Sequence, residues 1–72
     1  MGTVIRQKMA KRLRQLRREH GFTQEKLSEL SGVDYKHVQL LEGQKPSSVK
    51  IDTIEKLAKA FKISPSKLLE FT

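Results

Sequence analysis

The stretch from Thr23 to Glu42 constrains the fold of this chain more than any other part of its sequence. Thr23 can cap a helix that begins one residue later, because its hydroxyl oxygen can accept a hydrogen bond from a backbone N–H of the first turn. Leu27 and Leu30 have the spacing of a buried helical stripe. Gly32 predicts the end of this helix, because glycine adopts the left-handed conformation of a C-terminal cap.

A second short helix is expected from about Tyr35 to Glu42. Asp34 is placed to cap its N-terminus, and Val38 and Leu41 are expected to point inward. The connection between the two helices is too short for an antiparallel pair. The sequence therefore predicts two helices that cross steeply.

The rest of the chain predicts three more helices. The first spans about Val4 to Glu19, with an apolar stripe of Ile5, Met9, Leu13 and Leu16. Another begins near Ile51–Thr53. The core residues expected there are Ile51, Ile54, Leu57, Ala58 and Phe61. The last begins at Ser64-Pro65, a serine cap followed by a proline whose missing N–H does no harm at the first helical position.

These residues resemble the lambda-repressor/Cro-like helix-turn-helix proteins, often called the Xre family. The motif positions that match are Gln24, Leu27, Ser28, Gly32, Val33, Val38 and Leu41. The resemblance extends to LRQLR at Leu13–Arg17, TIEKLAKAF at Thr53–Phe61 and ISPSKLLEF at Ile63–Phe71. It implies an all-α fold class: a compact five-helix domain over residues 1–72, with the helix-turn-helix at helices 2 and 3. It also implies a sequence-specific DNA-binding transcriptional regulator, expected to repress by occupying an operator.

The charge of the chain favours a polyanionic partner, since the net charge is +7 and the pI is about 10.1. The excess is uneven. Residues 1–20 carry seven basic side chains against Glu19, whereas residues 21–72 carry eight against seven acidic ones. The basic side chains of the first helix therefore have two interpretations. They form an ordinary solvated face, or part of this face contacts phosphates or an acidic partner.

Several other classes of function have no support in the sequence. There is no cysteine and only His20 and His37, so we expect no metal site and no cofactor. No spacing brings a nucleophile and a base together, and there is no Gly-rich phosphate loop, so we expect no enzyme and no small-molecule ligand. No apolar run has membrane-spanning length. The expected location is the cytoplasm or nucleoid of a bacterium, with a bacterial or phage gene implied by the resemblance.

The resemblance places the outward residues of the second motif helix against the major groove. The residues expected to read bases are Tyr35, Lys36, Gln39 and Leu40. Lysine can donate to guanine, and glutamine can pair with base edges. Leu40 is open to two interpretations besides a chance exposed leucine: it contacts a thymine methyl group, or it belongs with Tyr35 to a protein-binding surface. The alternative function is therefore a non-enzymatic protein-interaction module on the same fold.

The resemblance also implies contacts with the DNA backbone. The candidate phosphate-binding residues are Gln24, Arg17, His37, Lys45, Ser47 and Ser48. Arg17 has a further expected role, because in the family an arginine at this position pairs with a glutamate at the end of the third helix, here Glu42. The partners expected are a double-stranded DNA operator and a second copy of the chain. Leu69 and Phe71 are open to two interpretations: they form a homodimer contact, or they close the core.

Overall fold

Five α-helices make up the described part of the chain. The computed structural model describes residues 2–46 and 48–70, and no strand is found among them. The helices are α1 (Gly2–Glu19), α2 (Gln24–Ser31), α3 (Tyr35–Glu42), α4 (Ile51–Ala60) and α5 (Pro65–Leu68). The predicted all-α, five-helix fold is confirmed.

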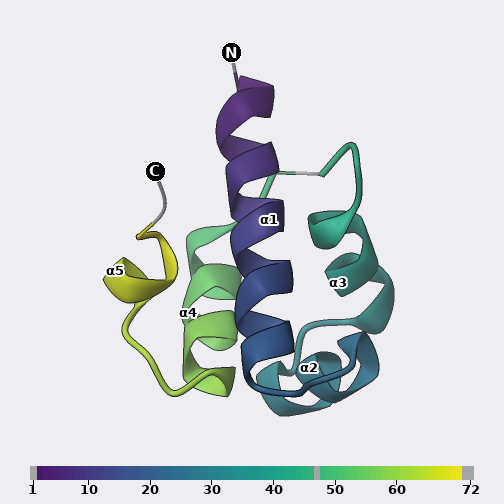
Figure 1. Ribbon diagram of the computed structural model, residues 1–72, viewed down its shortest axis with the longest axis vertical. Helices are drawn as coiled ribbons and strands as arrows, with labels where there is room; N and C mark the ends of the chain where they lie inside the picture. Colours follow the sequence, from purple (N-terminus) through teal and green to yellow (C-terminus); the bar gives the residue numbers. More distant parts are fainter. Residues whose placement is uncertain (1, 47, 71–72) are drawn as a thin grey trace.

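Helix α1 runs through the middle of the molecule (Figure 1). In this view α3 lies on one side of α1, α4 and α5 lie on the other, and α2 crosses the end where α1 stops. The first turns of α1 project beyond the other helices.

Most of the predicted apolar positions meet in a single core. Leu27, Leu57 and Leu68 are fully buried, and Phe61 is 1% exposed. Leucines at such positions each stabilise the fold by roughly 1.5–3 kcal/mol relative to an exposed side chain. The other members of the cluster are Met9, Leu13, Leu16, Val33, Val38, Leu41 and Ala58. The core thus draws on all five helices, and packing at this one cluster fixes α2 and α3 against α1.

The prediction of burial is wrong for three residues, all of which are exposed. Ile5 is 60% exposed, because it lies on the part of α1 that projects beyond its neighbours (Figure 1). Leu30 is 46% exposed, since the buried side of α2 is formed by Leu27 and Ser31 instead. Ile51 is 81% exposed, because it is the first residue of α4 and lies at the edge of that helix's buried face.

The predicted caps mostly hold. Thr23 accepts a hydrogen bond from the backbone N–H of Lys26 at 3.0 Å. Ser64 accepts one in the same way at the start of α5. Asp34 occupies the cap position of α3, but its side chain makes no capping hydrogen bond, so this detail of the prediction is wrong.

Candidate nucleic-acid interface

The turn between α2 and α3 is held by a left-handed glycine and by two serine hydroxyls. Gly32 has φ +76° and its N–H donates to the Ser28 carbonyl. The Ser28 hydroxyl donates to the Val33 carbonyl at 2.6 Å, and the Ser31 hydroxyl accepts from the Val33 N–H at 3.1 Å. These bonds satisfy the backbone of Val33, whose side chain is in the core. The turn is therefore fixed by local chemistry, which sets the crossing of the two helices.

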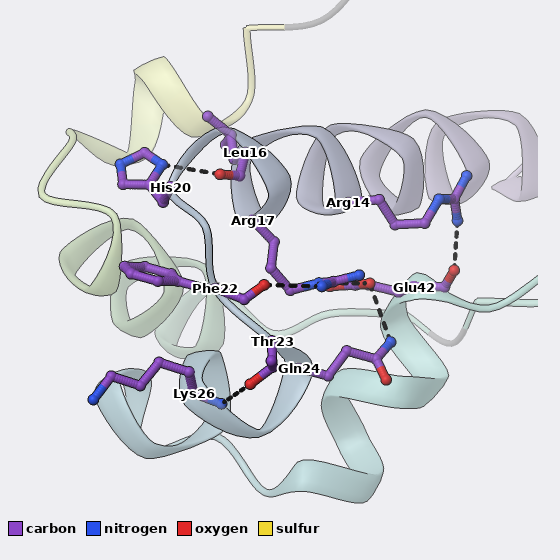
Figure 2. A network of polar contacts seen from close by, with 9 residues as sticks. All are labelled: Arg14, Leu16, Arg17, His20, Phe22, Thr23, Gln24, Lys26 and Glu42. Atoms are coloured by element: carbon purple, nitrogen blue, oxygen red, sulfur yellow. Dashed lines mark hydrogen bonds and ion pairs between the residues drawn. The ribbon is translucent and has the colours of Figure 1, made fainter.

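A buried carboxylate joins α1, α2 and the C-terminal end of α3. The Glu42 residue is 4% exposed. The Arg17 Nε donates to both of its carboxylate oxygens, at 2.9 and 3.1 Å, and the Gln24 Nε2 donates to Oε1 at 3.1 Å. The Arg17 Nη1 also donates to the Phe22 carbonyl at 3.0 Å. Figure 2 shows this network, with Glu42 between Arg17 and Gln24.

The structure thus brings together three residues that the sequence singled out: Arg17, Gln24 and Glu42. A buried ion pair of this kind adds little stability by itself, since the charges must first lose their water, but it specifies geometry when every donor and acceptor is used. No buried side-chain nitrogen or oxygen of the described residues lacks a hydrogen-bond partner. The network therefore locks α3 to the two helices beside it.

Two more arginines of α1 reach the carbonyl ends of other helices. Arg14 donates to the backbone carbonyl of Glu42, at the end of α3 (Figure 2). Arg12 donates to the carbonyls of Lys67 and Leu68, at 2.9 and 3.3 Å, where α5 ends. A cation is favourable at the negative end of a helix. Sequence reasoning missed both residues, because their partners lie 28 or more positions away and no local spacing identifies them.

The outward face of α3 carries all four side chains expected to read bases. Val38 and Leu41 are buried on the opposite side of the helix. Lys36 and Gln39 are exposed, Tyr35 is 41% exposed and Leu40 is 51% exposed. This face therefore offers a cation, an amide, a phenol and an apolar side chain on one helix, a set that can match the donors, acceptors and methyl groups of the major groove.

The described residues expected to contact phosphates have different settings, and the Arg17 guanidinium is already bonded to Glu42 and to the Phe22 carbonyl. Lys45 and Ser48 are exposed in the segment between α3 and α4, whereas His37 is half-buried. The side-chain amide of Gln24 is directed to Glu42, but Gln24 is also the first residue of α2, where backbone N–H groups favour an anion. Ser47 lies outside the described residues.

An apolar groove adjoins the segment between α3 and α4, and Ser48 is among its lining residues. Leu69 is 42% exposed and contributes to this groove. Its other lining residues are Ile5, Arg6, Met9, Leu41, Pro46, Ser48, Val49 and Ile54. Phe71, the second residue expected at a dimer contact, lies outside the described residues.

Two further features of the described residues bear on the class of protein. Over residues 2–46 and 48–70, no three His, Cys, Asp or Glu side chains are placed to share a metal ion. Within the same ranges, no helix combines the length and the apolar character needed to cross a bilayer.

The fold and the α2–α3 arrangement define a helix-turn-helix protein, and comparison with known families agrees. A family model of the Cro/C1-type helix-turn-helix DNA-binding domain matches residues 12–72. The chain belongs to this family. It therefore carries a DNA-binding domain of the kind that transcription regulators use.

A solved structure gives a more particular likeness. The chain is similar to the restriction-modification controller protein C.AhdI from Aeromonas hydrophila, with 40% sequence identity and a TM-score of 0.81. The match covers 88% of this chain and 94% of that protein. A search of curated protein sequences found no match.

Proposed function

We propose that residues 1–72 form a single domain that binds double-stranded DNA sequence-specifically and represses transcription by occupying an operator. The observation that carries this proposal is that α3 is exposed on one side and fixed in orientation on the other. Its four exposed side chains can reach base edges, while the Glu42 network holds the helix rigidly against α1 and α2. A helix that is both exposed and fixed in orientation suits major-groove readout.

Within this proposal each group has a role. Lys36 and Gln39 donate to base edges, Leu40 contacts a thymine methyl group, and Tyr35 reaches the edge of the groove. The backbone contacts come from residues around α3: Gln24, Arg17, His37, Lys45, Ser47 and Ser48. Phosphate contacts of this kind orient the protein, and base contacts supply the sequence preference.

We further propose that the chain acts as a homodimer through the surface that includes Leu69 and Phe71. One α3 makes few base contacts, so two copies on a two-fold operator supply the affinity. The exposed Leu69, which adjoins the apolar groove, supports this surface. The half-sites should then lie one helical turn apart, roughly 34–36 Å. Similarity to a restriction-modification controller favours genes of a restriction-modification system as targets, in a bacterial cytoplasm.

Alanine substitution on α3 tests the proposal. A good side-chain contact with a base contributes about 1–3 kcal/mol of discrimination, so Lys36→Ala and Gln39→Ala should each weaken operator binding about fivefold or more per half-site. Lys56→Ala, which removes an exposed cation from α4, is the matched control and should change the affinity little. Unchanged affinity in folded α3 variants would contradict the proposal and favour a protein-binding surface at Leu40 and Tyr35.

A further inference from the structure

Arg14 has binding capacity that its contacts within the chain do not use. It lies one turn before Arg17 on α1, and its Nη1 donates to the Glu42 carbonyl. A guanidinium carries five N–H donors in a planar fork. Among the described residues, Arg14 has no acidic side chain within ion-pair distance. Most of its donors, and its full charge, are therefore available to a ligand.

The surface around Arg14 forms a hollow lined by donors. This Arg14 hollow is lined by Gln7, Ala10, Arg14, Glu42, Gly43 and Gln44. Gln7 and Gln44 are exposed, and each carries an amide that can donate. The hollow therefore presents a guanidinium and two amides around a space that is open to solvent.

The acidic residue in this hollow does not repel an anion. The Glu42 side chain is 1% exposed, and its carboxylate is bonded to Arg17 and Gln24. Lys11, Arg18 and Glu19 line an adjoining hollow beside Arg14, so that two further cations face one carboxylate there. An oxyanion that can accept several hydrogen bonds at once fits this setting, and a guanidinium fork suits phosphate in particular.

The position of the hollow identifies the source of the phosphate. Gln24, at the start of α2, bonds the side chain of Glu42, and Arg14 bonds its backbone carbonyl. The two residues therefore lie on either side of the C-terminal end of α3 (Figure 2). The segment that carries Lys45 leaves from the same point. A DNA strand bound at the N-terminus of α2 and at this segment is therefore expected to pass Arg14 as well.

We propose that Arg14, with Gln7 and Gln44, binds a backbone phosphate of the DNA and extends the DNA-binding surface onto α1. This inference rests on the proposed function and adds a site to it. One of the basic side chains of residues 1–20 thereby gains a specific role. Arg14 then has two roles, since the same guanidinium holds the end of α3 and contacts the DNA that α3 reads.

The salt dependence of binding tests this contact. Each neutralised phosphate contributes about 0.9 to the slope of log K against log salt concentration. Arg14→Gln should therefore flatten the slope by about 0.9 per protomer, whereas Arg14→Lys should retain it. Lys59→Gln, which removes an exposed cation from α4, is the charge-matched control and should leave the slope unchanged. Weaker binding by Arg14→Gln with the wild-type slope would mean that Arg14 only braces α3, and would overturn the proposal.

Substitution of Gln7 gives a second test, because it leaves the hydrogen bond between Arg14 and the Glu42 carbonyl intact. Gln7→Lys should steepen the slope and tighten binding, and Gln7→Glu should weaken binding. Equal affinity and slope in both Gln7 variants would also overturn the proposal. The slopes are measured on operator DNA and on random-sequence duplex. A wild-type protein that binds both duplexes equally refutes sequence-specific readout, while the comparison of slopes still decides whether Arg14 contacts a phosphate.

Discussion

Removal of the Glu42 carboxylate should destabilise this protein far more than removal of an ordinary surface charge. The Glu42 side chain is 1% exposed and that of Arg17 is 16% exposed, so the pair belongs to the buried class. Glu42→Ala leaves the Arg17 charge without its partner and leaves the Gln24 amide without its acceptor. Breaking such a pair from one side typically costs about 3–5 kcal/mol.

The structure places the expected cost near the lower end of that range. Arg17 keeps its hydrogen bond to the Phe22 carbonyl at 3.0 Å, and its partly exposed guanidinium can gain some water. We therefore expect a loss of about 3 kcal/mol in the free energy of unfolding. For a domain of this size that corresponds to a fall in Tm of about 12–24 °C.

Urea denaturation followed by circular dichroism measures this loss. Glu29→Ala is the matched control, because Glu29 pairs with Lys26 at 3.6 Å while 74% exposed, and such surface pairs contribute about 0–1 kcal/mol. In a double variant, Arg17→Met with Glu42→Leu, the uncompensated charge is gone, so part of the stability should return. The reasoning would be refuted if Glu42→Ala cost less than about 1 kcal/mol, as the control should.

Three other substitutions test separate parts of the structure. Gly32→Ala should cost about 1–2 kcal/mol through its φ of +76° alone, because nothing lies within 4 Å of an added Cβ; a thermal melt with an unchanged Tm would contradict this. Arg12→Ala removes the donors to the carbonyls at the end of α5, so hydrogen exchange there should accelerate while exchange in α2 stays slow; equal rates in the variant and the wild type would show that Arg12 does not hold α5. Leu69→Glu should convert the proposed homodimer to monomer in sedimentation velocity without unfolding it, and a variant that dimerises like the wild type would exclude this surface as the interface.

The fold was predictable because most of its determinants are local. The threonine cap at Thr23, the left-handed Gly32 and the serine cap at Ser64 each act within one helical turn, and the structure confirms all three. The apolar periodicity placed most of the core for the same reason. It failed at Ile5, Leu30 and Ile51, whose exposure depends on how far the neighbouring helices extend and on which side of each helix they cover. Periodicity within one helix does not contain that information.

The candidate site was predictable only where the family pattern extended to it. The pairing of Arg17 with Glu42 follows from resemblance, whereas the contacts of Arg12 and Arg14 do not. In the sequence, both residues look like members of a solvated basic face. Arg14 nevertheless binds one backbone carbonyl of a distant helix and Arg12 binds two, and any helix end offers such carbonyl groups. Their roles therefore require the three-dimensional structure.

Selection of a randomised duplex DNA library on the purified protein, at near-physiological salt and followed by sequencing, tests the central claim most directly. We expect enrichment of a two-fold-symmetric motif with half-sites about one helical turn apart. We further expect Lys36→Ala and Gln39→Ala each to relax the preference at particular positions of that motif. No enrichment by folded wild-type protein would contradict sequence-specific readout by α3.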